Sequence, residues 1–163
     1  ALTGLLNRGA IQDRLDKELA LARRTGQPLG VVIGDVDLFK GVNDRFGHLA
    51  GDSVLREVAR RLQVQARDGD SLGRYGGEEF LFVLFPCNRD EVARAGERFR
   101  CGIAQAPFTI AGEVPCNIGI TISLGAACTE GCPDTTAQQL LLRADEALYK
   151  SKAAGRNCVT VAD

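Results

Sequence analysis

Two groups of acidic side chains carry the chemistry that this sequence could perform. Asp35 and Asp37 follow a short apolar run, 29–34, while Glu78 and Glu79 lie between two glycines and a second apolar run. An unpaired carboxylate at the end of a buried strand is costly, so Asp35 needs a partner, and a bound cation would supply one. The alternatives are that Asp35 caps the next turn and that the glutamates lie on a solvated hairpin tip.

The glycine pair Gly76-Gly77 precedes the two glutamates. We expect a tight hairpin turn here, because glycine adopts positive φ without a Cβ clash. Glycine also lets a ligand approach the backbone closely. Two adjacent acids on such a turn are well placed to hold a metal ion.

Other polar residues suit an anion. The segment 39–48 mixes a cation, amides and glycines, and we expect it to be a connecting segment that binds a phosphate or polar ligand. His48, taken alone, is more typical of a structural histidine. Lys152 and Arg156, four residues apart at the end of a predicted helix, would either offset the helix dipole or hold an anion.

The elements that must position these residues follow from apolar spacing. Helices are predicted over about 8–25, from Asp52 or Ser53 onward, over about 89–105, and from Thr135 or Thr136 to near Gly155. The polar face of the second helix is most simply solvated; its members are Arg56, Glu57, Arg60, Arg61 and Gln63. Strands are predicted at 29–34, 71–75, 80–85, 108–110, 115–127 and 157–161, the fourth and fifth flanking Gly112-Glu113.

This order predicts an α+β fold, with one mostly antiparallel central sheet, a βαββαβ core and flanking helices. In that layout the hairpin tip lies near the end of the first strand. Asp35 would then converge with Glu78 and Glu79 in an all-oxygen magnesium site beside a polyphosphate.

Composition excludes two functional classes. A net charge of −1 over 163 residues leaves no surplus of Lys and Arg for nonspecific nucleic-acid binding. No apolar stretch approaches the roughly 20 residues of a membrane span. With one histidine and no CxxC pair, a zinc site is disfavoured, and the cysteines indicate reduced thiols in a cytoplasmic protein. They are Cys87, Cys101, Cys116, Cys128, Cys132 and Cys158.

Taken together, these motifs resemble the GGDEF family of diguanylate cyclases, in its GGEEF variant. The resemblance covers nearly the whole chain and rests on 2–8, on 35–52, on the signature 74–80 and on 144–157. It implies one domain over 1–163 with a palm-like, nucleotidyl cyclase-like core. The family's opening acid, just before Leu2, is absent. We therefore expect a domain excised from a longer bacterial signalling protein, without its upstream regulatory domain.

The resemblance implies an enzyme that condenses two GTP into cyclic di-GMP and pyrophosphate, across a transient dimer of two such domains. It implies Mg²⁺, or Mn²⁺, held by Asp35, the carbonyl of Val36 and Glu78. Glu78 would also accept the proton of the 3′-hydroxyl, and Glu79 would support the metal site. Lys40 would stabilise the transition state.

By the same resemblance, Asn43 and Asp52 would contact guanine, and Asp52 would favour GTP over ATP. His48 and Phe39 would also contact the nucleotide. Lys152 and Arg156 would face the phosphates.

Three further residues resemble the family's RxxD site for inhibition by the product: Arg67, Asp70 and Arg98. The resemblance implies no nucleic-acid partner, no direct membrane contact and a cytoplasmic domain, whose parent protein could be membrane-tethered. Two alternatives stay open. One is a catalytically silent module that senses cyclic di-GMP or GTP, and the other is a related two-metal cyclase or polymerase palm.

Overall fold

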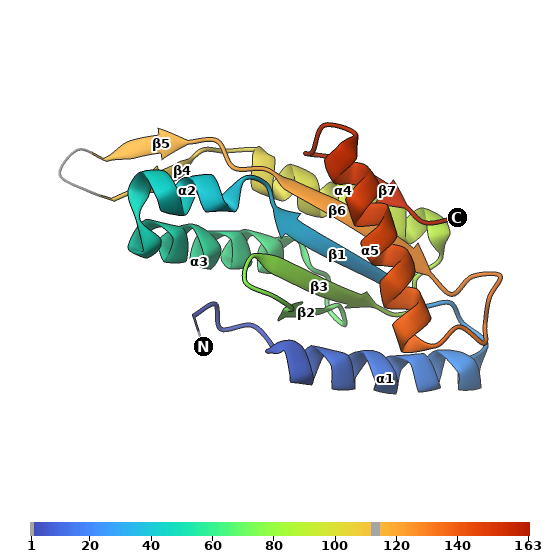
Figure 1. Cartoon of the computed structure of the whole chain (residues 1–163). Helices are drawn as coiled ribbons and strands as arrows, with labels where there is room; N and C mark the ends of the chain where they lie inside the picture. Colours follow the sequence, from blue (N-terminus) through green and yellow to red (C-terminus); the bar gives the residue numbers. More distant parts are fainter. Residues whose placement is uncertain (1, 112–114) are drawn as a thin grey trace.

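A five-stranded sheet forms the centre of the molecule (Figure 1). The computed structural model describes residues 2–111 and 115–163. The strand order is β2-β3-β1-β6-β7, and every neighbouring pair is antiparallel except β6 and β7. The strands are β1 (Gly30–Val36), β2 (Ser71–Arg74), β3 (Glu79–Leu84), β6 (Ile122–Cys128) and β7 (Val159–Val161). The predicted α+β fold with a mostly antiparallel sheet is confirmed.

Helices cover both faces of the sheet because the central strands are apolar on both sides. In β1, Val31 and Ile33 pack in one core cluster, while Val32 and Val36 pack in the other. The first cluster lies under α1 (Arg8–Thr25) and α5 (Ala137–Ala153). The second lies under α2 (Phe39–Phe46), α3 (His48–Gln65) and α4 (Arg89–Ala104). No helix in the described ranges is long and apolar enough to cross a membrane.

The segment after β1 differs from the sequence prediction. It is the helix α2, not a connecting segment, because Phe39 and Val42 bury one face and Phe46 packs beside them. Gly47, with φ 84°, separates α2 from α3. As a result α3 begins at His48, several residues before the predicted start at Asp52 or Ser53.

The long predicted strand 115–127 is two strands. β5 (Cys116–Ile118) pairs with β4 (Phe108–Ile110) in a separate two-stranded sheet, and β6 joins the main sheet. The pairing of β6 with β1 reaches back to Thr121, whose carbonyl accepts a hydrogen bond from the Asp37 N–H at 2.9 Å. The predicted turn at Gly112-Glu113 lies outside the described residues.

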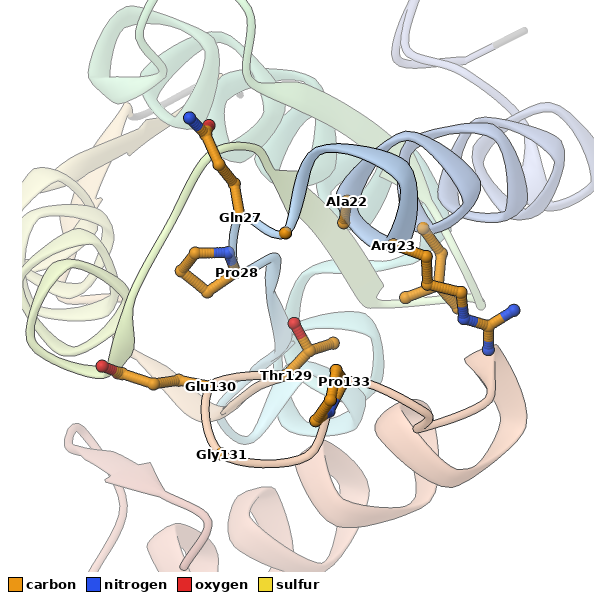
Figure 2. Close-up of a pocket in the computed structure, with 10 residues that line it drawn as sticks. Ala22, Arg23, Gln27, Pro28, Thr129, Glu130, Gly131 and Pro133 are labelled. Atoms are coloured by element: carbon orange, nitrogen blue, oxygen red, sulfur yellow. The ribbon is translucent and has the colours of Figure 1, made fainter.

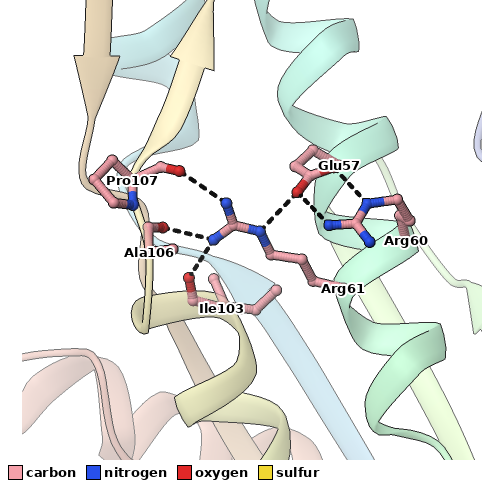
Figure 3. A network of polar contacts seen from close by, with 6 residues as sticks. All are labelled: Glu57, Arg60, Arg61, Ile103, Ala106 and Pro107. Carbon is pink, nitrogen blue, oxygen red and sulfur yellow. Dashed lines mark hydrogen bonds and ion pairs between the residues drawn. The ribbon is translucent and has the colours of Figure 1, made fainter.

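Arg61 of α3 is buried, although the sequence indicated a solvated face (Figure 3). Its guanidinium donates to the carbonyls of Ile103 at 3.0 Å, Ala106 at 2.6 Å and Pro107 at 2.8 Å. It also pairs with Glu57 at 2.8 Å. These bonds satisfy carbonyl groups at the end of α4 and hold the approach to β4 against α3.

The close packing of α5 on β6 generates a testable expectation. A Cβ on Gly125 would overlap the backbone carbonyl of Ala144 and the backbone nitrogen of Leu148. We expect Gly125→Ala to lower the free energy of unfolding by about 3 kcal/mol, because a helix must move away from the sheet. Urea unfolding measures this. Gly119→Ala, where a Cβ meets no atom within 4 Å, is the control, and an equal loss in both variants would contradict the interpretation.

Candidate active site

The acidic residues meet at the end of β1. Asp35 and Glu79 are direct partners in the antiparallel pairing of β1 with β3, so their side chains leave the same face of the sheet. The Val36 N–H donates to the carbonyl of Glu78 at 3.2 Å, which holds the hairpin loop against the end of β1. The predicted convergence of these acids, across more than forty residues of sequence, is confirmed.

The hairpin loop is shaped by hydrogen bonds from both sides. The Arg74 guanidinium donates to the carbonyl of Gly77 at 2.6 and 3.0 Å, and the Tyr75 N–H donates to the carbonyl of Glu79 at 2.8 Å. Neither Gly76 nor Gly77 has the positive φ that the sequence predicted. Gly76 is instead needed for space, because a Cβ there would overlap the Glu79 carboxylate.

Lys152 supplies a positive charge beside the acids. Its Nζ lies 3.2 Å from Oδ2 of Asp35. Burial nevertheless raises the pKa of Asp35 above its ordinary value, and Lys152 only partly offsets this effect. Burial also raises the pKa values of Glu78 and Glu79, with the charge of Asp35 as the next cause in both. The three carboxylates therefore favour an added cation.

These carboxylates fit a magnesium ion that shares its ligands with a substrate. Within residues 2–111 and 115–163, no group of three or more His, Cys, Asp or Glu side chains is arranged to hold a metal by itself. Mg²⁺, however, is usually bound through one or two carboxylates, with water and substrate phosphates completing the shell. Asp35 and Glu78 can supply that number of hard oxygen ligands.

Asn43 and Asp52 come together where α2 meets α3. Oδ1 of Asn43 is buried, and no hydrogen-bond partner for it lies in the described part of the chain. It faces Gly51, where a Cβ would overlap it. Asp52 follows in α3 and is half-buried, and His48 is exposed in the first turn of that helix. A buried oxygen without a donor is suited to accept a hydrogen bond from a ligand.

The amino end of α2 faces the strand end that carries the acids. Leu38 precedes this helix with φ 56°, and no side chain caps its first turn. Lys40 lies exposed in that turn. The side chain of Phe39 is buried in the core, which leaves only its backbone for contact with a ligand. Free N–H groups and a lysine at a helix amino end favour an anion.

The residues predicted to form an inhibitory site also meet. The turn 67–70 is closed by hydrogen bonds between Arg67 and Asp70, with the Arg67 N–H 2.8 Å from the Asp70 carboxylate. Arg98 of α4 reaches the same carboxylate at 3.6 Å and donates to the carbonyl of Gln65 at 2.7 Å. Burial lowers the pKa of Arg98, and the charge of Arg67 adds to this effect. The Asp70 carboxylate thus binds the backbone of Arg67 and the guanidinium of Arg98.

Comparison with known proteins identifies the family. The family model described as diguanylate cyclase, GGDEF domain, matches residues 1–158. The chain belongs to the GGDEF domain family. It is 44% identical over 162 residues to diguanylate cyclase DgcP of Pseudomonas aeruginosa, covering 99% of this chain and 23% of that protein. It is 43% identical over 159 residues to diguanylate cyclase DosC of Escherichia coli, covering 97% and 34%.

A solved GGDEF domain has the same fold. The crystal structure of the GGDEF domain of DgcB from Caulobacter crescentus in complex with c-di-GMP matches with a TM-score of 0.94 and 36% identity. The match covers 100% of this chain and 92% of that one. This chain spans about a quarter to a third of the length of the curated relatives DgcP and DosC.

Sequence reasoning assigned no role to two residues of this GGDEF domain that shape the site. Gly51 leaves room in α3 for the side chain of Asn43 from α2. Asp37 is buried and its carboxylate accepts three hydrogen bonds, from Thr121 at 2.7 Å, Ser123 at 2.6 Å and the Asn157 N–H at 3.1 Å. The only available signal was its position two residues after Asp35, beyond the expected end of the strand.

The GGDEF domain also has a cavity away from the acids (Figure 2). Its volume is about 310 Å³, and its lining includes Ala22, Arg23, Pro28, Thr129 and Pro133. These residues lie at the end of α1, just before β1 and just after β6, at the opposite end of the sheet from Asp35. The cavity is therefore separate from the candidate active site.

The raised pKa values give an expectation for Glu78. Because the folded state binds this proton more tightly than the unfolded chain, its stabilising contribution is present below pH 4.5 and is lost as pH rises through the raised pKa. In metal-free protein at pH 8, we therefore expect Glu78→Gln to raise the melting temperature. The gain should shrink toward pH 5. Differential scanning fluorimetry measures both values.

Added Mg²⁺ should favour the wild type over Glu78→Gln in melting temperature. At pH 8 the ion should raise the melting temperature of the wild type more than that of Glu78→Gln, because the carboxylate is a ligand. Glu146→Gln, at an exposed position of α5, is the matched control and should respond like the wild type. An equal response to Mg²⁺ in all three proteins would contradict metal binding by Glu78.

Proposed function

We propose that this chain is the catalytic domain of a diguanylate cyclase, which joins two GTP molecules into cyclic di-GMP and releases two pyrophosphates. One observation carries the proposal: Asp35 and Glu79 face each other across β1 and β3 beside Glu78, with Lys152 as counter-charge. The relatives DgcP and DosC, both named diguanylate cyclases, support it.

In this proposal Asp35, the carbonyl of Val36 and Glu78 hold Mg²⁺, or Mn²⁺, and Glu79 supports them. The ion would neutralise charge on the triphosphate. The phosphates lie between the amino end of α2, with Lys40, and the end of α5, with Lys152 and Arg156. Both segments adjoin Asp35, since Lys152 of α5 pairs with it and α2 begins four residues after it.

The reaction needs a proton acceptor and stabilisation of phosphate charge. The 3′-hydroxyl of each GTP attacks the α-phosphate of the other, one P–O bond forms, and the bond from the α- to the β-phosphate breaks. Glu78 takes the hydroxyl proton, since a carboxylate within reach of the attacking hydroxyl can act as a general base. Lys40 lies where it can neutralise charge on the transferring phosphorus.

The polar residues where α2 meets α3 would select guanine. The Asp52 carboxylate can accept from the N1–H and N2–H₂ groups of guanine, and the unpartnered oxygen of Asn43 can accept as well. Adenine has no such pair of donors on that edge. His48 and the backbone of Phe39 border the same nucleotide.

Two such domains must face each other, because each holds one GTP and supplies one attacking hydroxyl. Cyclic di-GMP would then inhibit the enzyme by binding at Arg67, Asp70 and Arg98. The guanidinium groups of the two arginines can bind guanine edges or phosphates. The structure of the DgcB domain in complex with c-di-GMP supports binding of the product.

Turnover tests the main proposal. With GTP and Mg²⁺, the wild type should form cyclic di-GMP, resolved by chromatography, at a rate that rises faster than linearly with protein concentration. Glu78→Gln should lower the rate by at least about a hundredfold, the lower range for loss of a general base. A wild type that binds GTP but makes no product, even when fused to a dimeric partner, would support the sensor alternative instead.

Inhibition tests the second site. We expect Arg67→Ala to raise the concentration of cyclic di-GMP that halves the rate by at least about tenfold, the loss expected for one charge-assisted contact. Arg60→Ala, on the exposed side of α3 and away from both sites, is the matched control and should keep the wild-type value. If cyclic di-GMP inhibited the wild type, Arg67→Ala and Arg60→Ala equally, Arg67 would have no part in product inhibition.

A further inference from the structure

The chain between α5 and β7 has an unusual backbone. Gly155, Arg156 and Asn157 have φ values of 111°, 65° and 47°, so three consecutive residues lie at positive φ. Glycine tolerates this region and asparagine visits it more often than most residues, but Arg156 is strained there. Such strain persists only when the surrounding contacts impose it. The contacts around this loop must therefore hold it in this conformation.

Asp37 makes the central contact. Its Oδ2 accepts the Asn157 N–H at 3.1 Å and the Thr121 hydroxyl at 2.7 Å, and its Oδ1 accepts the Ser123 hydroxyl at 2.6 Å. The carboxylate is buried, so these bonds are shielded from water. One side chain after β1 thus ties the strained loop to β6.

Further contacts hold the other sides of the loop. The Arg156 N–H donates to the Ser151 carbonyl at 3.1 Å, and Arg100 of α4 donates to the Asn157 side chain at 3.0 Å. With its backbone held at both residues, the exposed side chain of Arg156 projects from a fixed base. The loop lies beside Asp35, because Asp37 is only two residues further along the chain and Lys152, just before the loop, pairs with Asp35.

We propose that Asp37 is a positioning residue, which holds the loop 155–157 so that Arg156 presents its guanidinium to the substrate triphosphate. Asp37 itself touches no substrate. This inference rests on the proposed function, because it assumes that the triphosphate lies beside Asp35 and Arg156. It assigns a task to the second acid of the pair Asp35 and Asp37.

Binding without turnover gives the sharpest test. 3′-Deoxy-GTP lacks the attacking hydroxyl, so it binds without reacting, and 3′-deoxyguanosine also lacks the phosphates. The dissociation constant of 3′-deoxyguanosine divided by that of 3′-deoxy-GTP therefore measures the contribution of the phosphates to binding. By calorimetry with Mg²⁺, we expect Asp37→Ala to lower this ratio about tenfold, as loss of one charge-assisted contact would. Asp37→Asn, whose amide oxygen can still accept from Asn157, should recover most of the loss.

Two variants separate positioning from a general loss of stability. Ser123→Ala removes a hydrogen bond to Asp37 on the oxygen that does not contact the loop. It should lower the melting temperature and leave the ratio unchanged. Asp37→Ala combined with Arg156→Ala should bind no more weakly than Arg156→Ala alone, because both changes remove the same contact. Additive losses, or an equal loss in Ser123→Ala, would overturn the proposal.

The wild type provides a measurement that needs no variant. The Asn157 N–H should exchange with deuterium slowly, because a buried carboxylate holds it, and fast exchange would overturn the proposal. If the wild type bound 3′-deoxy-GTP no better than 3′-deoxyguanosine, the proposed function would fail instead. Tight binding by the wild type with an unchanged ratio in Asp37→Ala would overturn the role of Asp37 alone.

Discussion

Two carboxylates placed opposite each other on neighbouring strands are the constraint on which this domain depends. The pairing of Asp35 with Glu79 is set by the register of β1 and β3, and like charges in such a pair repel. The apolar residues of both strands keep this register, because a shift by one residue would turn the buried side chains outward. The apolar core thus keeps Asp35 opposite Glu79 although the two carboxylates repel each other. Positive charge from Lys152 or a metal ion offsets this repulsion.

The sequence predicts most of the fold and the acid cluster, because both depend on local patterns. Apolar runs mark the strands, and the acids stand at their ends. The helix α2 was missed because its apolar face has only three members, Phe39, Val42 and Phe46, among polar residues and a glycine. The role of Asp37 was invisible because its partners lie 84 to 120 residues away in the chain.

One hairpin links the two candidate ligand sites. Asp70 directly precedes β2, and Glu78 directly precedes β3. Beneath the hairpin, Phe82 of β3 stacks on Phe99 of α4 with ring centroids 3.8 Å apart, next in sequence to Arg98. The residues of both sites are therefore mounted on elements that share one close-packed core.

At position 156, the residue type that would best stabilise the fold differs from the one that would best bind substrate, because Arg156 has positive φ. A glycine there would relieve about 1 kcal/mol of backbone strain. It would also delete the guanidinium that we propose binds the triphosphate. Laboratory evolution that rewarded heat resistance alone would drift toward glycine at this codon, whereas a screen for turnover would restore arginine.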